Sequence, residues 1–340
     1  MKKDKLKVIS LFSGYGTQEL ALKYIGVDYE VVANCDNFKQ ANECYDVLHN
    51  TQSGNLGDIT KVTKEEFPQC DLLTYSFPCQ DISISGIQRG IKEGTRSGLL
   101  YDVERLLSTN RPKFLLMENV KNLISKNHYE NFKKHIYFLR GLGYTSYWRL
   151  LNGADFGCPQ NRERVFMISV LDGNHEDVAR KMENVDNYKK ERVPMRQFIE
   201  DMEDPNLFIN CQYTIHQPKT NSVCKLIARR DDISYDQARR IYSIDGCSPC
   251  LTTSGSPQIM TEDGRVRNIT AREGYRFMGV RDEDIDLLLT TSLSTKAHVS
   301  LAGNSICVPV MEAIFSEFFN DYITRKEPVL SNQSNQQLND

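Results

Sequence analysis

Cys79 has the residue type and the sequence neighbours of a covalent nucleophile. It stands directly after Pro78, which ends the short buried strand predicted by the apolar run 71–75. Serines and glycines are frequent over residues 83–98, so a long loop is expected after the cysteine. A thiolate at the mouth of a strand can attack an electrophilic carbon, and the loop can cover the reactants. For this residue alone, a buried structural cysteine is the competing interpretation.

Charged side chains stand at the ends of two further predicted strands. Glu118 follows the apolar run 113–117, and Arg162 and Arg164 stand two residues apart at the start of another run. A glutamate in such a place can act as a general acid or base. Alternate residues of a strand point to the same side, so the two guanidinium groups suit a planar acceptor or a phosphate. The structural alternatives are a helix-capping glutamate and arginines paired with Glu163.

These residues need a scaffold in which strands alternate with helices. Such alternation predicts an α/β fold with a Rossmann-like, mostly parallel sheet. In such a sheet the carboxyl ends of parallel strands meet at one edge, where ligands bind. The strands predicted for the sheet are 7–12, 29–34, 71–75, 113–117, 143–151 and 162–170.

A glycine turn and two acids predict a nucleoside-like cofactor. Gly14 and Gly16 separate the first strand from a helix, and this arrangement exposes backbone N–H groups to a ligand. The third glycine of the dinucleotide fingerprint is missing, which disfavours a pyrophosphate. Asp36 and Asp58 follow at the same sheet edge, where carboxylates can bind ribose hydroxyls and an adenine amine. The set favours S-adenosylmethionine, although each acid alone would be read as a solvated turn residue.

The composition is that of an ordinary globular protein of 340 residues, enough for one large domain and one smaller domain. The formal net charge of -3 argues against a purely electrostatic nucleic-acid binder but leaves room for a local basic cleft. Ten cysteines without a signal-peptide core predict reduced thiols and a cytoplasmic location. Apolar runs are short, so we expect no transmembrane segment.

Taken in order, the motifs resemble those of the DNA (cytosine-5) methyltransferases of bacterial and phage restriction–modification systems. The resemblance covers roughly residues 6–170 and 247–320. One motif alone is weak evidence, but eight in this order at compatible spacings are specific. The motifs are Phe12-Ser13-Gly14-Tyr15-Gly16, Gly57-Asp58-Ile59, Pro78-Cys79-Gln80, Arg96-Ser97-Gly98-Leu99, Glu118-Asn119-Val120, Gln160-Asn161-Arg162-Glu163-Arg164, Arg267-Asn268-Ile269-Thr270-Ala271-Arg272-Glu273 and Gly303-Asn304-Ser305.

The resemblance implies a mechanism and a cofactor site. Cys79 would add to C6 of a cytosine flipped out of the duplex, while Glu118 holds N3 and the exocyclic amine. Arg164 would reach O2, with Arg162 nearby, and C5 would take the methyl group of S-adenosylmethionine. The run Asp36-Asn37-Phe38 departs from the glutamate, apolar residue and aspartate usual in the family. The implied cofactor-binding residues are Phe12, Gly14, Gly16, Asp36, Asp58, Ile59, Pro78, Leu99 and Asn304.

The resemblance also implies how the chain is divided. We expect a catalytic domain over 1–173, a smaller, mostly irregular or β target-recognition domain over 174–280, a return to the catalytic domain over 281–325, and a disordered tail over 326–340. Within the second domain, 219–240 carries six basic and three acidic residues, a net charge of +3, and 248–254 is expected to form a turn and a strand. Candidate DNA-binding residues are Gln80, Ser83, Arg229, Arg230, Arg239 and Arg240, each of which could instead lie on a solvated face.

Other interpretations stay open at this point. Cys247 and Cys250 have zinc-like spacing, but no second such pair occurs, so no metal is expected. The expected partners are double-stranded DNA and a cognate restriction endonuclease acting on the same sites, with a monomeric enzyme. A transfer-RNA cytosine-5 methyltransferase and an inactive DNA-binding regulator on the same scaffold are the rival functions.

Overall fold

The computed structural model describes residues 4–50, 54–78, 96–201, 204–219, 221–253 and 256–323. The predicted nucleophile Cys79 and the DNA-binding candidates Gln80 and Ser83 lie outside these ranges. The expected tail over 326–340 lies outside them as well.

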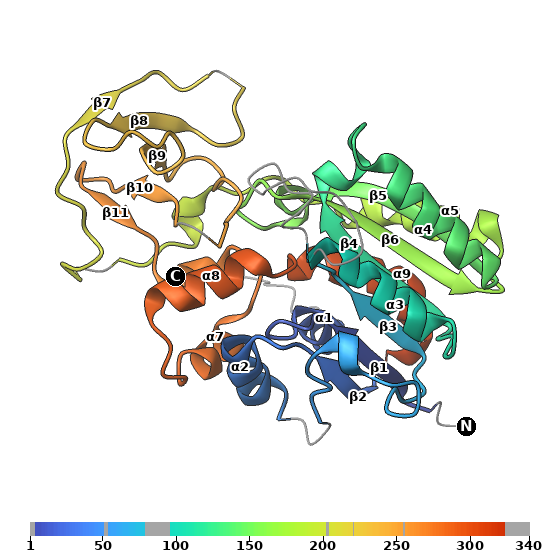
Figure 1. Ribbon diagram of the computed structural model, residues 1–340. Helices are drawn as coiled ribbons and strands as arrows, with labels where there is room; N and C mark the ends of the chain where they lie inside the picture. The colour runs from blue at the N-terminus through green and yellow to red at the C-terminus, as the bar shows by residue number, and fades with distance from the viewer. Residues whose placement is uncertain are drawn as a thin grey trace, which may run out of the picture.

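The described residues form two lobes, each built on its own sheet (Figure 1). The larger sheet has the order β2-β1-β3-β4-β6-β5. Its strands are β1 (Leu6–Leu11), β2 (Tyr29–Cys35), β3 (Leu72–Tyr75), β4 (Phe114–Val120), β5 (Tyr144–Asn152) and β6 (Glu163–Leu171). Every strand predicted for this sheet is present, with ends within a few residues of those expected.

The directions of the strands decide which strand ends lie at the same edge of the sheet. β1 pairs in parallel with β2 and β3, and β3 with β4, whereas β6 runs antiparallel to β4. The carboxyl ends of β1, β3 and β4 therefore share one edge with the amino end of β6. That edge, the catalytic edge below, carries Pro78, Glu118 and Arg164.

Helices cover both faces of the large sheet. Phe114 and Leu116 of β4 pack into a cluster with α1, α5 and α9, while Leu115 and Met117 pack into a cluster with α3 and α4. This alternation of side chains is the period of two that a buried strand requires. The helices are α1 (Thr17–Tyr24), α2 (Lys39–His49), α3 (Leu100–Leu107), α4 (Tyr129–Gly141), α5 (His175–Asn184) and α9 (Val308–Phe319).

Short 3₁₀ helices complete the connections. They are η1 (Ile59–Lys61), η2 (Arg96–Leu99), η3 (Lys121–Ile124), η4 (Gly153–Phe156), η5 (Val185–Tyr188), η6 (Met195–Gln197) and η7 (Asn320–Tyr322).

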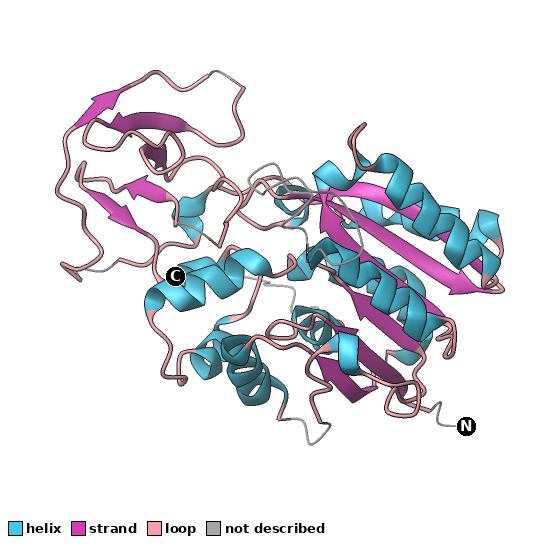
Figure 2. Cartoon of the chain, in the orientation of Figure 1, coloured by secondary structure: helices cyan, strands magenta, loops and turns pink. Residues whose placement is uncertain are grey.

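The second lobe is mostly loop around a small sheet of order β11-β10-β9-β8-β7 (Figure 2). Its cluster of buried apolar side chains consists of Ala228, Ile241 and Val266, with partly buried neighbours. Its strands are β7 (Tyr213–Ile215), β8 (Leu226–Arg230), β9 (Arg240–Ser243), β10 (Gln258–Met260) and β11 (Val266–Asn268).

Two of the contacts between the second lobe and the catalytic lobe lie along the returning chain. Arg267 of β11 forms a buried bidentate ion pair with Glu273, at 2.7 and 2.8 Å. Glu273 lies in α6 and closes a capping box with Thr270. A Cβ atom at Gly303 would lie 2.8 Å from the carbonyl oxygen of Thr252, so the two backbones touch there. The chain returns through α6 (Ala271–Arg276), α7 (Asp282–Leu288) and α8 (Thr295–Asn304).

The strand expected over 248–254 was a wrong prediction for the part that the structure describes. Residues 248–253 make isolated bridges and a turn but no strand. The side chains of Gln160 and Arg162 bind the N–H and the carbonyl of Leu251, at 2.9 and 3.1 Å, so the backbone pairs with side chains rather than with a strand. The predicted domain limits stay predictions, although α5 packs on β5 and β6 of the large sheet.

Among the described residues, the stretch Thr295–Tyr322 has the length and a mean hydropathy of 1.4 that could cross a membrane. It is 67% buried inside the protein, and the chain leaves the helical conformation at Ser305, where ψ is -179°. A buried, interrupted core helix is weak evidence for a membrane span.

Candidate functional site

The pairing of β4 with β6 brings Glu118 and Arg164 together. Arg164 pairs with Val120, and Glu118 pairs with Phe166. Glu118 and Arg164 are therefore diagonal neighbours on one face of the sheet. Their side chains form an ion pair, with 3.2 Å between Arg164 Nε and Glu118 Oε1. The predicted proximity of the carboxylate and this arginine follows directly from the register.

The segment before Cys79 is held by side chains from two elements, β4 and η2. Ser76 donates a very short hydrogen bond from its hydroxyl to Glu118 Oε2. Asn119 Nδ2 donates to the carbonyl of Phe77 at 3.0 Å, and Ser97 Oγ donates to the carbonyl of Pro78 at 2.8 Å. The backbone that leads to Cys79 is thus positioned from β4 and η2. Sequence analysis gave no role to Ser76, Asn119 or Ser97, although all three lie within or beside its motifs.

Arg162 is an architectural residue in this structure. Its guanidinium is buried and donates to the carbonyl oxygens of Leu251, Gly303 and Ser305, at 3.1, 2.9 and 2.7 Å. These acceptors belong to the end of the second lobe and to the end of α8. Arg162 therefore ties three distant segments together, whereas Arg164 faces the carboxylate.

Cys250 is a site residue that the sequence did not indicate. Its sulfur accepts hydrogen bonds from Arg162 Nη1 at 3.1 Å and from Arg164 Nη2 at 3.5 Å. Burial acts to raise the pKa of the thiol, but the two positive charges outweigh burial, so the pKa is lowered. The signal that could have found it is the expectation that both arginines point the same way and share an acceptor.

The glycine turn after β1 lies against Asp36. Three residues of the turn have positive φ: Phe12 at 56°, Gly14 at 56° and Gly16 at 81°. The Gly14 N–H donates to Asp36 Oδ2 at 2.9 Å, and the Phe38 N–H donates to Oδ1 at 2.8 Å. Burial raises the pKa of the Asp36 carboxyl, against the lowering effect of these N–H donors. Two sequence-predicted cofactor residues thus meet across the ends of β1 and β2.

The other predicted cofactor residues line the same region. Phe12, Ile59 and Leu99 belong to one apolar cluster. The half-exposed carboxylate of Asp58 caps η1, and hydrogen bonds from the Thr60 side chain and N–H lower its pKa. Asn304 is exposed at the end of α8, where the next residue, Ser305, shares a 2.8 Å hydrogen bond with Tyr15 of the glycine turn.

This arrangement fits S-adenosylmethionine. A Cβ atom at Gly14 would meet nothing within 4 Å, whereas one at Gly16 would lie 2.1 Å from His49 Nε2. The turn is therefore packed against His49 at Gly16, whereas the space beside Gly14 is open. An open turn that binds the Asp36 carboxylate, with Phe12 packed in an apolar cluster, suits a nucleoside that carries an amino acid.

The arginines predicted to bind DNA form ion pairs within the second lobe. Arg229 and Arg240 both pair with Asp236, Arg230 pairs with Asp232, and Arg239 lies 3.9 Å from Asp231. These four arginines share three aspartates and leave one positive charge, and two lysines supply the rest of the +3 charge of this stretch.

The two cysteines with zinc-like spacing, Cys247 and Cys250, form hydrogen bonds with other groups. Cys247 Sγ donates to the carbonyl of Val193 at 3.4 Å, and Cys250 faces the arginines. Within the ranges that the structure describes, no cluster of three or more His, Cys, Asp or Glu side chains could hold a metal ion.

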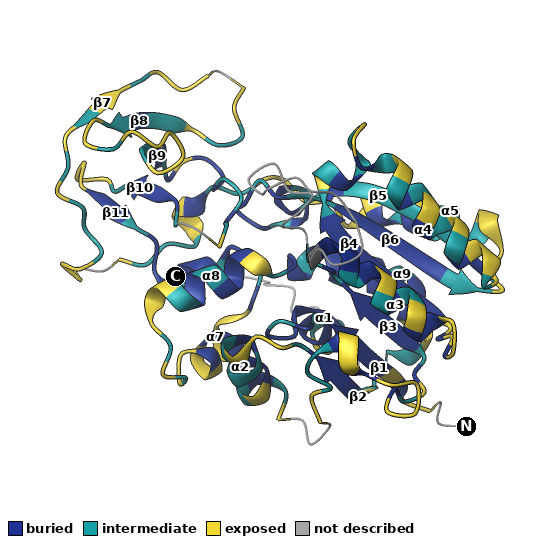
Figure 3. Cartoon of the chain, viewed as in Figure 1, coloured by how far each residue is buried: buried dark blue, intermediate teal, exposed yellow. Residues whose placement is uncertain are grey.

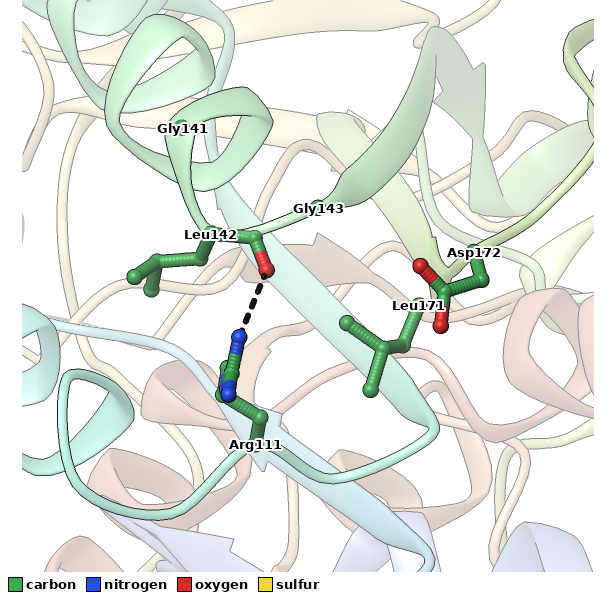
Figure 4. A pocket seen from close by; sticks show the side chains of 6 residues that line it. All are labelled: Arg111, Gly141, Leu142, Gly143, Leu171 and Asp172. Carbon is green, nitrogen blue, oxygen red and sulfur yellow. Dashed lines mark hydrogen bonds between the residues drawn. The ribbon is translucent and has the colours of Figure 1, made fainter.

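One cavity lies at the opposite edge of the large sheet. It has a volume of about 500 Å³ and includes Arg111 before β4 and Leu171 at the end of β6 (Figure 4). Arg111 donates to the carbonyl of Leu142 at 3.5 Å, and Asp172 is the acidic residue of the lining. Its lining residues include no nucleophile, so we assign the chemistry to the catalytic edge.

Comparison with known proteins shows the family of the chain. The C-5 cytosine-specific DNA methylase profile matches residues 6–320. Type II methyltransferase M2.ScrFI of Lactococcus lactis subsp. cremoris is 35% identical over 304 residues, which cover 87% of this chain and 79% of that protein. Orphan methyltransferase M.SPBetaI of Bacillus phage SPbeta is 27% identical over 440 aligned positions, which cover 95% and 99% of the two chains.

A solved structure shares the fold. The crystal structure of the S. pombe Dnmt2 methyltransferase superposes with a TM-score of 0.73 at 22% identity, covering 93% of this chain and 99% of that one. The α/β prediction with a Rossmann-like methyltransferase sheet is confirmed. Because the family profile spans nearly all of the described residues, the chain belongs to the C-5 cytosine-specific DNA methylases, which methylate C5 of cytosine in DNA.

Proposed function

We propose that this enzyme methylates cytosine within one short sequence of double-stranded DNA, with Cys79 as the nucleophile. The observation that carries the proposal is the Glu118–Arg164 ion pair at the catalytic edge, beside the fixed backbone of Ser76–Pro78. The carboxyl group of Glu118 can hold N3 and the exocyclic amine of a flipped cytosine, while Arg164 reaches O2. Cys79 follows Pro78 directly in the sequence.

The chain's residues divide the chemistry into easier steps. The Cys79 sulfur forms a bond to C6, which makes C5 nucleophilic, and Glu118 stabilises the added electron density by hydrogen bonding at N3. After C5 has been methylated, loss of its proton expels the sulfur and breaks the bond to C6. Arg164 keeps the ring in place throughout, and its pairing with Glu118 keeps both groups in register.

The family's reaction depends on S-adenosylmethionine, which supplies the methyl group. For its binding we propose the residues of the glycine turn and its surroundings. Gly14, Asp36 and Asp58 would meet its polar groups, and Phe12, Ile59 and Leu99 its apolar surface. Gly16, Pro78 and Asn304 complete the proposed set.

The substrate of the family is DNA. We propose that the second lobe reads the target, with Arg229, Arg230, Arg239 and Arg240 exchanging aspartate partners for phosphates, and with Gln80 and Ser83 near the flipped base. We further propose a cytoplasmic monomer that protects the sites cut by a cognate endonuclease. An orphan enzyme without a nuclease, as the phage relative is named, is the alternative setting.

The decisive experiment is methyl transfer from labelled S-adenosylmethionine to mixed genomic DNA and to transfer RNA in parallel, followed by single-base mapping of 5-methylcytosine. We expect label at one short DNA motif. Label in transfer RNA alone would contradict the proposal, and silence on both substrates would favour a DNA-binding regulator.

A further inference from the structure

Cys250 connects the two arginines of the site to the second lobe. It precedes Leu251, whose backbone is bound by Gln160 and Arg162, so its position is set by the large sheet. Its sulfur is the acceptor shared by Arg162 Nη1 at 3.1 Å and Arg164 Nη2 at 3.5 Å.

The two arginines depend on this sulfur to different degrees. Arg162 keeps three backbone carbonyl acceptors without it. Arg164 is held by Glu118 on Nε, by the carbonyl of Glu163 at 2.9 Å on Nη1, and by Cys250 on Nη2. Each nitrogen of its guanidinium thus has a different partner. Without the sulfur, Arg164 Nη2 loses this partner. The guanidinium must lie in the plane of the base to bind it, so the loss matters.

Charge supports the geometry. The two guanidinium groups lower the pKa of the Cys250 thiol against the effect of burial, so they favour its thiolate form. The neighbouring thiols of Cys224 and Cys247 behave in the opposite way, because burial raises their pKa. A charge-assisted hydrogen bond is stronger than a neutral one, so the Arg164–Cys250 contact is more than packing.

We propose that Cys250 is a positioning residue for methyl transfer, because its sulfur holds the Arg164 guanidinium against Glu118 in the geometry that receives the target cytosine. This inference rests on the proposed function, since it assigns Arg164 the role of binding the base. The sulfur acts through Arg164 and does not touch the reacting atoms.

The test compares Cys250→Ala and Cys250→Ser with a matched control, Cys247→Ala, in the full-length protein. We expect Cys250→Ala to lower kcat by about tenfold, the size of one charge-assisted hydrogen bond, with an unchanged KM for S-adenosylmethionine. Cys250→Ser should recover part of the loss because a hydroxyl still accepts from Arg164. Turnover of Cys250→Ala equal to that of Cys247→Ala would overturn the inference.

A double-mutant cycle separates positioning from packing. In an Arg164→Ala background, Cys250→Ala should cause no further fall in kcat, because the residue acts through the missing guanidinium. Multiplicative losses would show that Cys250 acts by another route and would overturn the proposal. Failure of the proposed function looks different, since the wild-type protein itself would then leave DNA unmethylated.

Discussion

The two lobes differ in how far each is stabilised by its own apolar core. The catalytic lobe has two apolar clusters that fill both faces of its sheet, and the central strands β1, β3 and β4 are almost wholly buried (Figure 3). The separate apolar cluster of the second lobe has three buried members, and Tyr242 and Ile259 of its strands pack into a cluster of the catalytic lobe instead. Its strands have three to five residues and are half-buried or exposed over much of their length. A core this small contributes little to stability, so the second lobe depends on its joints with the first lobe.

The largest effect should come from the chemistry of the catalytic lobe. Glu118→Gln keeps the shape but gives Arg164 a neutral partner and cannot relay a proton. We expect kcat to fall by about 10²–10⁴-fold while DNA affinity stays close to the wild-type value. Single-turnover methylation and filter binding measure the two quantities. Wild-type turnover would remove Glu118 from the mechanism, and lost DNA binding would mean that the lobes are not functionally separate.

The next largest effect should come from the Arg267–Glu273 ion pair between the two lobes. Arg267→Leu leaves Glu273 buried without its partner, which should lower the free energy of unfolding by about 3–5 kcal/mol in urea titrations. The double variant Arg267→Leu/Glu273→Leu should recover much of this loss, because no buried charge remains. An exposed pair, Arg265 with Asp263, is the matched control, and Arg265→Leu should change stability little.

A smaller effect should distinguish the apolar core of the second lobe from that of the catalytic lobe. Ile241→Ala in the second lobe and Ile168→Ala in the first each remove a buried aliphatic side chain, at a cost of about 2–5 kcal/mol for the well-packed site. We expect Ile168→Ala to lower the Tm of the whole protein. Ile241→Ala should mainly unfold the second lobe locally. Limited proteolysis would detect this as cleavage within 204–268. A global loss of equal size from both variants would contradict the comparison.

The smallest effect should be a loss of stability in mild acid. Burial lowers the pKa of His49 and His298 below the ordinary value near 6.5. The unfolded chain therefore binds more protons, so their contribution to stability is complete above the unfolded pKa and is lost as the pH falls through the folded pKa. His298→Gln, which can still reach Tyr275 and Thr291, should flatten the decline in unfolding free energy between pH 7 and 5. An unchanged slope would exclude His298 as a source.

Sequence patterns predicted the catalytic lobe well because its strands are continuous apolar runs and its motifs stand at their ends. The register of β4 with β6 then places Arg164 beside Glu118. Arg162 shows the limit of this reasoning, because a buried arginine bound to carbonyls has the same sequence signature as one that binds substrate. The strands of the second lobe escaped prediction because segments such as Tyr213–Ile215 are too short for a periodic signal.

The contact of Gly303 with Thr252 has a consequence for how such enzymes diverge and can be recombined. The returning chain must pass α8 at a point where no side chain fits. Insertions between β6 and Cys250 can therefore lengthen this segment without moving the return point. A chimaera that imports a foreign second lobe should be spliced before Cys250, so that the sulfur acceptor of Arg164 and the native crossing at Gly303 are both inherited.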